Sequence, residues 1–555
     1  MSKLSFLSVK YRLPCLLACL WLPQSATATD PGSQQLREQQ TQVRELEQQQ
    51  RLRQWRQREQ PAEDAAPAPE PTREPGCLPV SGVRLSGNQL LSDHDMQQTL
   101  RPWVRPCMGL TDINHLLKAV TDRYVQAGYP AARPYLASLP HAHAPLDIRV
   151  VEGFVETIEM AGPTLPLSLR GAFPDLVGRP LYLPDLEQGL DQLNRLQAFS
   201  LFADLLPGEL PGGSRVVLQP QAVGKRWHLQ ARSDNRGSDT LGRHRWGVHL
   251  GLDSPLAIND YLNLSFNALL PDAPGHSQAM GLYYNVPYGP WTAGLNLNRI
   301  SFQTTGLVEG ESGFYGLNVG RMLWRDQRGM LSASVRLDHK RLLNRFAGAR
   351  MAVQSPRLTS LEAGLDLLWL QDGLWNLHVG VAQGLDWLGA DSERLRRDAP
   401  QPQFRKYSAS LLHLREGPTT SRWRWQSELN LQYSPDALPA VEQITLTDDS
   451  AVRGYRQTTV AGAIGAVWRN TLSSPLPVPG LPGTTVRPQL GVDLGWARLE
   501  HGRAPERLLG GVIGLRLERP DAQLRLDYQH GLHARRPGHR SGEPGFWVVE
   551  LTLNM

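Results

Sequence analysis

The chain has 555 residues, of which 41% are hydrophobic, and a formal net charge of +5. No run beyond the N-terminus approaches the ~18–20 consecutive apolar residues of a membrane-spanning helix, which excludes a helical membrane protein. A membrane β-barrel stays compatible with this composition, because its strands alternate polar and apolar residues and are hydrophilic on average.

The N-terminus is typical of a secretory signal. Basic residues precede the short apolar run 13–22, and Ala26-Thr27-Ala28 is a small-x-small cleavage site. This pattern predicts a signal peptide over residues 1–28, with Thr29 as the first mature residue. The apolar run is too short for the alternative, a membrane anchor. Export also argues against nucleic acid as a partner.

Two cysteines, Cys77 and Cys107, stay in the mature chain. An even pair in an exported protein predicts one disulfide, here closing a loop of about thirty residues. The alternative is a redox or metal pair, but the spacing matches neither a CxxC motif nor a zinc site.

Residues 29–60 are rich in Gln, Glu and Arg and predict a helix. Its apolar residues are too sparse for a face that packs on an apolar core, so we expect it in a water-lined cavity. A disordered arm is the alternative. Residues 61–76 are rich in Pro, Ala and Glu and predict an extended linker.

Two small α+β modules are predicted next, over residues 77–153 and 154–224. In the first, Ser92 is a candidate N-cap for a helix to about Leu100, and a second helix is expected over 112–126. In the second module the expected helix covers residues 185–196. Its leucines Leu186, Leu190 and Leu193 are expected in the core rather than in a ligand groove.

Residues 225–555 show a monotonous alternation of apolar and polar residues in runs of strand length, such as 246–252, 262–268 and 331–337. Trp and Tyr recur near the run ends, as in the aromatic girdles of membrane barrels. At roughly twenty residues per strand and loop, this region predicts about sixteen antiparallel strands, a number ordinary for a transmembrane β-barrel. The last run places Trp547, Val549, Leu551 and Leu553 on one face.

A polar segment between two such runs carries Val452-Arg453-Gly454-Tyr455. An arginine next to a glycine in such a segment needs a partner, and Asp493 in the run 490–495, facing into a barrel, is a candidate for a charge-assisted latch. Three other carboxylates compete for this role: Glu428, Asp448 and Asp449.

The sequence predicts no catalytic site, no cofactor and no metal site. It contains no nucleophile elbow, phosphate-binding loop, zinc-protease motif or pair of catalytic carboxylates. His141 and His143 form a His-x-His pair that suggests a metal, but nearby Pro140 and Pro145 favour an exposed loop.

This organisation resembles the two-partner secretion transporters, or TpsB family. The resemblance covers essentially the whole mature chain: signal, polar helix, Pro-rich linker, two POTRA-like modules and a C-terminal barrel. Its motifs are the cysteine pair, Val151-Glu152-Gly153, the segments 170–174 and 185–196, and Val452-Arg453-Gly454-Tyr455. One departure is the last residue, Met555, because family members usually end in Phe.

The resemblance implies a protein in the bacterial outer membrane with its POTRA modules in the periplasm. Residues 31–60 would plug the lumen, Arg453 would pair there with Asp493, and Cys77 would be bonded to Cys107. The modules would capture an unfolded exoprotein, namely a haemagglutinin, haemolysin or contact-dependent toxin, and the barrel would pass it outward without ATP. Outer-membrane lipid, the barrel-assembly machinery and periplasmic chaperones are the other implied partners.

Two alternatives stay open from the residues alone. An insertase or assembly factor belongs to the same superfamily, but it is favoured only with more POTRA modules than the two expected here. A passive porin or adhesin barrel has no need of tandem modules or of the luminal arginine motif.

Overall fold

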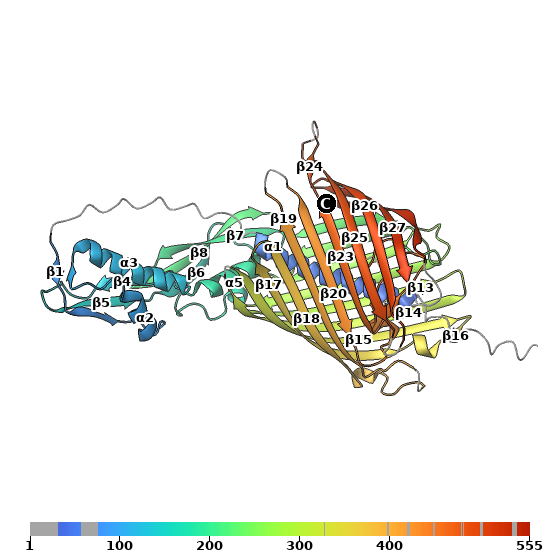
Figure 1. The fold of residues 1–555 in the computed structure, drawn as a ribbon, viewed down its shortest axis with the longest axis horizontal. Coiled ribbons are helices and arrows are strands. Elements are labelled where there is room, and N and C mark those ends of the chain that lie inside the picture. The colour runs from blue at the N-terminus through green and yellow to red at the C-terminus, as the bar shows by residue number, and fades with distance from the viewer. Residues whose placement is uncertain are drawn as a thin grey trace, which may run out of the picture.

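The computed structural model describes residues 31–56, 76–326, 328–396, 399–418, 422–447, 450–478, 480, 482–499, 503–535 and 541–555. The predicted signal peptide and nearly all of the predicted linker lie outside these ranges. Two small modules stand in a row at one end of a β-barrel, and helix α1 (Pro31–Arg56) lies inside the barrel (Figure 1). The predicted fold class is confirmed.

The first module packs two helices on a three-stranded sheet. Ser92 caps helix α2 (Asp93–Leu100) by accepting a hydrogen bond from the backbone NH of Asp95. Helix α3 (Leu110–Gln126) buries Ile113, Leu116, Val120 and Tyr124. The other elements are β1 (Leu78–Pro79), β2 (Gly82–Ser86), β3 (Cys107–Met108), β4 (Arg133–Leu136) and β5 (Pro145–Val151), with the sheet in the order β2-β5-β4.

A disulfide joins Cys77 to Cys107, with the two Cα atoms 5.4 Å apart. It lies beside the short pairing of β1 with β3, in which Pro79 faces Cys107. The bridge therefore fixes the start of the module to the segment that precedes α3.

Glu152 joins the end of the first module to helix α3 and to the segment that precedes helix α2. Its Oε1 accepts hydrogen bonds from the Tyr124 hydroxyl at 2.8 Å and from the Leu90 backbone NH at 2.7 Å. Burial raises the pKa of Tyr124, and the hydrogen bond to Glu152 raises it further. The glutamate of the Val-Glu-Gly segment thus has a structural role.

The second module repeats the plan of the first. Strands β6 (Phe154–Met160), β7 (Phe199–Pro207) and β8 (Gly213–Val223) form a sheet in the order β6-β8-β7, in which β6 and β8 run parallel. Helices α4 (Leu169–Ala172) and α5 (Leu183–Asn194) cover it. Leu186 and Leu193 are buried and Leu190 packs against the same core, as predicted.

Sixteen long antiparallel strands close the barrel, because β28 pairs with β9. Two further pieces, β16 (Ala349–Arg350) and β24 (Leu476–Pro477), only extend hairpins. The long strands are β9 (Trp227–Asp234), β10 (Arg245–Asp253), β11 (Tyr261–Leu269), β12 (His276–Tyr288), β13 (Trp291–Gln303), β14 (Val308–Arg325), β15 (Gly329–Phe346), β17 (Arg357–Leu370), β18 (Leu374–Leu385), β19 (Arg405–Glu416), β20 (Arg424–Tyr433), β23 (Ile464–Ser473), β25 (Thr485–Arg498), β26 (Glu506–Glu518), β27 (Ala522–Arg535) and β28 (Glu543–Asn554).

Side chains alternate between the two faces of the barrel wall, as the period of two requires. On β25, Leu490, Val492 and Leu494 are between 44% and 58% exposed on the outside, while Asp493 between them is fully buried. Exposed tryptophans, including Trp246, Trp291, Trp324, Trp375, Trp468 and Trp547, lie on the wall of the barrel. This distribution is that of a barrel with an apolar outside and a polar lumen.

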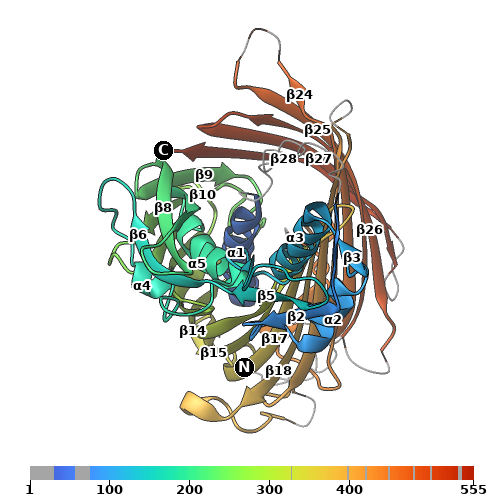
Figure 2. The ribbon, with the colours of Figure 1, turned by 90° about the vertical axis from the view of Figure 1, so that its left-hand side faces the viewer.

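Helix α1 lies within the ring of strands when the barrel is viewed from the modules (Figure 2). Among the residues described, no helix has the length and apolar character needed to cross a bilayer. The apolar residues of α1, expected from the sequence to be too sparse to pack on an apolar core, do contact the wall. Leu36 is fully buried in a cluster with barrel residues, and Val43 packs against a second cluster.

Some elements begin earlier than expected from the sequence. The helix expected over 112–126 begins at Leu110, and the helix expected over 185–196 runs from Leu183 to Asn194. Each helix starts two residues sooner, because Asp112 accepts a hydrogen bond from the backbone NH of Gly109 at 3.0 Å and because a Pro lies in the first turn of α5.

Candidate functional site in the barrel lumen

The long connection between β20 and β23 folds into the lumen instead of extending away from the barrel. It contains the short 3-10 turn η4 (Ala440–Glu442) and the two-residue strands β21 (Ile444–Thr445) and β22 (Ala461–Gly462). Its tip is Val452-Arg453-Gly454-Tyr455, and all four residues are buried. We call these four residues the loop tip.

Arg453 is joined to Asp493 by a bidentate ion pair. The Arg453 Nε donates to Asp493 Oδ2 and Nη2 donates to Oδ1, both at 2.6 Å. The backbone NH of Arg453 also donates to Oδ2, at 3.0 Å. Nη2 donates to the carbonyl of Asn470 at 3.1 Å as well. The side chains are 4% and 0% exposed, so the charges are sealed from solvent and compensate each other.

Three glycines on β25 and β26 make room for this pair. A Cβ at Gly491 would lie 2.5 Å from Arg453 Nη2, and a Cβ at Gly495 would lie 2.7 Å from a methyl group of Val452. A Cβ at Gly510 would lie 1.9 Å from the Arg453 carbonyl oxygen. The loop tip therefore rests in a socket that any larger residue would fill.

Gly454 is required by the turn itself. Its φ is +97°, in the left-handed region, and a Cβ there would lie 2.3 Å from the His530 carbonyl carbon. The adjacent Tyr455 donates its hydroxyl to the carbonyls of Leu509, at 2.9 Å, and His533, at 2.6 Å. The loop tip thus bonds to strands β25, β26 and β27 through side chains and backbone together.

The two residues after the loop tip are hydrogen-bonded to the last strand of the barrel. The backbone NH groups of Arg456 and Gln457 both donate to Glu543 Oε2 on β28, at 2.8 and 3.0 Å. Val452 packs in an apolar cluster with Leu446 and with wall residues Ala497, Leu508 and Ala534. The loop tip and the residues after it are consequently fixed to the part of the wall formed by β25 to β28.

The competing carboxylates have other positions. Glu428 lies 3.6 Å from Arg469 on the neighbouring strand. Asp448 and Asp449 lie outside the described residues. Arg453 is therefore brought to Asp493 rather than to Glu428.

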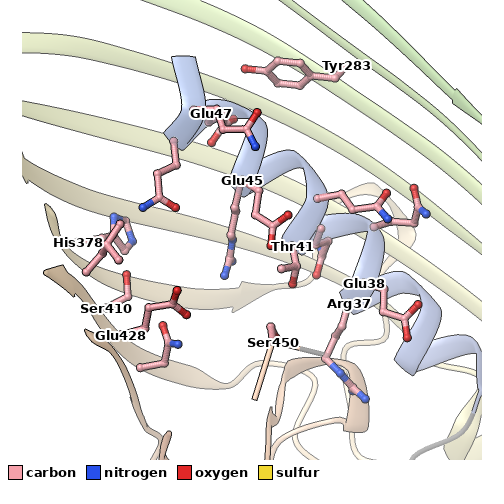
Figure 3. Close-up of a pocket in the computed structure, with 18 of the residues that line it drawn as sticks. Arg37, Glu38, Thr41, Glu45, Glu47, Tyr283, His378, Ser410, Glu428 and Ser450 are labelled. Atoms are coloured by element: carbon pink, nitrogen blue, oxygen red, sulfur yellow. The ribbon is translucent and has the colours of Figure 1, made fainter. Parts of the chain in front are cut away.

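Helix α1 crosses the lumen and is held largely by polar contacts. Glu38 pairs with Arg245 at 3.0 Å, Glu47 pairs with Arg336 at 3.1 Å, and Arg51 pairs with Asp366 at 2.6 Å. Figure 3 shows Arg37, Glu38, Glu45 and Glu47 of the helix facing the cavity that separates it from the wall. This cavity has a volume of about 1180 Å³ and is lined by polar residues from many strands.

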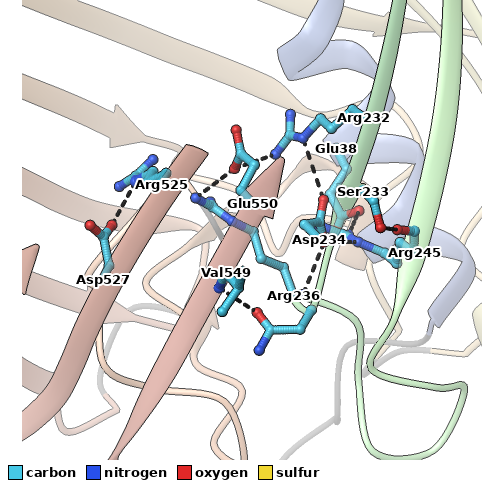
Figure 4. A network of polar contacts seen from close by, with 11 residues as sticks. Glu38, Arg232, Ser233, Asp234, Arg236, Arg245, Arg525, Asp527, Val549 and Glu550 are labelled. Carbon is cyan, nitrogen blue, oxygen red and sulfur yellow. Dashed lines mark hydrogen bonds and ion pairs between the residues drawn. The ribbon is translucent and has the colours of Figure 1, made fainter. Parts of the chain in front are cut away.

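A network of ion pairs between side chains spans the seam where β28 pairs with β9 and closes the barrel (Figure 4). Arg232 lies 3.4 Å from Asp234 and 3.0 Å from Glu550, and Asp234 also accepts from Arg245 at 2.8 Å. Since Arg245 is the partner of Glu38, the network reaches α1. The two strands themselves pair over only the short stretch from Asp234 to Gln230.

The second module is joined to the barrel by two buried arginines. Arg195, next to α5, donates to Asn285 at 2.6 Å and to the carbonyl of Asn259 at 2.5 Å. Arg325 of β14 pairs with Asp191 of α5 at 2.5 Å. Asn285 also donates to Gln50 of α1 at 3.1 Å, so the module, the barrel and the helix meet at one point.

Sequence reasoning missed several of these residues. Glycines two residues on each side of Asp493 were a usable signal, because they mark a close approach of another backbone to the strand. Tyr455 bonds to carbonyl groups and Glu543 to NH groups of the main chain, so no residue type in the sequence indicates either contact. His141 and His143 are exposed, and no group of potential metal ligands occurs within the described ranges.

Comparison with known proteins gives one consistent result. The family model of the haemolysin secretion/activation proteins ShlB/FhaC/HecB matches residues 212–517, a ShlB-type POTRA model matches 78–153, and a further POTRA model matches 154–207. The haemolysin transporter protein ShlB of Serratia marcescens is 36% identical over 82% of this chain and 81% of its own. The haemolysin transporter protein HpmB of Proteus mirabilis is 32% identical over 86% of each chain.

The similarity extends to a solved structure. The fold matches that of CdiB from Escherichia coli with a TM-score of 0.84, over 96% of this chain and 100% of the other, at 25% sequence identity. The outer membrane transporter CdiB of an Escherichia coli strain is also 30% identical over 87% of this chain and 83% of its own.

Proposed function

This chain belongs to the ShlB/FhaC/HecB family of two-partner secretion transporters, and from that premise we propose that its cargo is a large exoprotein of the haemolysin type. It is an outer-membrane transporter with periplasmic POTRA modules and a secreted exoprotein as its partner. The haemolysin class is favoured because two haemolysin transporters are 36% and 32% identical to it over most of their length. A contact-dependent toxin and a haemagglutinin are the alternative cargoes.

The unfolded exoprotein binds first to the modules and then passes through the lumen, without ATP. The observation that carries this route is the way α1 occupies the lumen. Its contacts to the wall are mostly ion pairs and hydrogen bonds, such as Glu47 with Arg336, and a polar chain or water can replace such partners when the helix leaves. An apolar plug would have to expose its surface on leaving.

The pair of Arg453 and Asp493 acts in this route as a latch for the loop. It holds the loop tip against β25 to β27 and so keeps this part of the loop out of the path of the plug or the cargo. Because the pair is sealed from solvent, detaching the loop costs more free energy than breaking an exposed ion pair would.

The remaining partners follow from the location. The apolar wall of the barrel contacts outer-membrane lipid, and the barrel is inserted by the barrel-assembly machinery after delivery by periplasmic chaperones. An insertase function, the alternative within the superfamily, is less well supported than transport, because the haemolysin relatives described above are transporters.

Co-expression of the full chain in Escherichia coli with the exoprotein encoded beside its gene tests the proposal. Export of that exoprotein into the medium, with lysis of red cells, supports a haemolysin. Inhibition of neighbouring cells without red-cell lysis assigns a contact-dependent toxin instead. Retention of the exoprotein in the periplasm, with the barrel correctly inserted, refutes the proposed partner.

A further inference from the structure

The turn η4 carries a buried carboxylate between two lysines of the barrel wall. Glu442 Oε1 lies 2.5 Å from Lys340 Nζ of β15, and its Oε2 lies 2.5 Å from Lys406 Nζ of β19. The Glu442 side chain is 2% exposed, and those of Lys340 and Lys406 are 5% and 13% exposed. One carboxylate thus joins the loop to two strands that lie apart in the wall.

The same turn contacts the N-terminal part of α1. Arg37 donates from Nη1 to the carbonyl of Ala440 at 2.6 Å. Leu36, fully buried, shares an apolar cluster with Val441, which is 3% exposed. The wall residues of that cluster are Ala279, Ile300, Phe314, Leu342 and Leu358.

The loop therefore has two anchors on different parts of the wall. The loop tip is bound to β25, β26 and β27 by Arg453 and Tyr455. The turn η4 is bound to β15 and β19 by Glu442. Arg37 and Leu36 connect α1 to the second of these anchors.

We propose that Glu442 is a positioning residue that holds η4 on the wall and thereby sets the resting position of the N-terminal half of α1. This inference rests on the proposed function, in which α1 closes the lumen at rest. A glutamine at position 442 leaves Lys340 and Lys406 without the negative charge they share. The turn η4 then shifts, and α1 loses its contacts with it, while the loop tip keeps its own contacts.

The position of α1 is measured directly with two engineered cysteines. Gln35 of α1 donates to Ser277 of β12 at 2.6 Å, so cysteines at these two positions can be joined by a short bis-methanethiosulfonate reagent in isolated outer membranes. We expect Glu442→Gln to lower the yield of this cross-link about tenfold, since losing one partner of a buried ion pair is strongly destabilising. Conductance of the reconstituted barrel should rise in parallel.

Glu428→Gln is the matched control, because Glu428 is a carboxylate of the barrel wall that pairs with Arg469 and faces the cavity in Figure 3. It should leave the cross-link unchanged. Val441→Ala removes the contact with Leu36 without burying an unpaired charge, and it should lower the yield in the same direction even if Glu442→Gln fails to insert.

A wild-type cross-link yield in inserted Glu442→Gln overturns the inference, and so does a wild-type yield in Val441→Ala if Glu442→Gln fails to insert. An equal loss in Glu428→Gln also overturns it, because any luminal charge would then have the same effect. The cross-link reports where α1 lies whether or not α1 blocks ions. A lower yield with no change of conductance therefore supports the role of Glu442 and contradicts the proposed plug.

Discussion

Replacing Arg453 with alanine removes the cation from a sealed site and leaves its partner in place. Asp493 is 0% exposed and accepts three hydrogen bonds from Arg453, two from the guanidinium and one from the backbone. Only the backbone bond survives the substitution. The carboxylate is then a buried charge with no cation to compensate it.

The expected cost follows from this geometry. Breaking a buried pair by removing one partner costs about 3–5 kcal/mol, because the remaining charge stays desolvated. Since 1.4 kcal/mol corresponds to a factor of ten, the detached state of the loop becomes on the order of 100-fold to 4,000-fold more populated. The barrel wall itself keeps its backbone hydrogen bonds, so insertion should be preserved.

Three variants separate the role of the latch from general damage. Arg453→Ala should abolish or sharply reduce secretion, measured as exoprotein in the medium, while heat-modifiable migration in gels reports an intact barrel. Arg453→Lys keeps the charge but loses the two-pronged geometry, so it should secrete at an intermediate level. Arg299→Ala is the control, because Arg299 forms an exposed, 3.6 Å contact with Glu311 and should secrete normally.

Normal secretion by inserted Arg453→Ala would refute the latch. So would an equal loss in Arg299→Ala, because the effect would then follow from losing any arginine of the barrel.

Three further predictions concern other parts of the chain. Deleting residues 31–56 should raise the ion conductance of the reconstituted barrel and largely spare secretion, and an unchanged conductance would count against the plug. Gly510→Ala should reduce secretion, because its Cβ would lie 1.9 Å from the Arg453 carbonyl oxygen, whereas Gly320→Ala, with its nearest heavy atom at 3.7 Å, should not; equal secretion by both would contradict the glycine socket. Replacing Cys77 and Cys107 with serine should lower the stability of the first module by about 2–5 kcal/mol, detected as faster proteolysis of that module; an unchanged rate would mean that the bridge does not limit its opening.

Much of the fold followed from the sequence because its period is regular. Alternation such as Leu490, Val492 and Leu494 around Asp493 determines which face of a strand points outward, and the number of such runs gives the size of the barrel. The position of the polar helix could be predicted less well from the sequence. A helix with few apolar residues fits a water-lined cavity, but the apolar contacts of Leu36 and the cationic partner of Glu47 come from wall residues that are distant in the sequence.

The site was partly predictable for a related reason. Arg453 and Asp493 are of complementary charge, so a search for a partner could pair them from the sequence. Glu442, Lys340 and Lys406 belong to distant segments whose register in the barrel decides that they meet, and no local pattern indicates it. Contacts to backbone atoms, such as those of Tyr455, leave no signature in the residue types that receive them.

Passage of the exoprotein through the lumen is tested most directly by photo-cross-linking during secretion. Ser334 on β15 lines the lumen, whereas its neighbour Val335 is 51% exposed on the outer face. With a photoreactive amino acid at either position, a cargo stalled in transit should give an adduct with position 334 and none with position 335. Adducts absent at 334, or equally strong at 335, would contradict transport through the lumen.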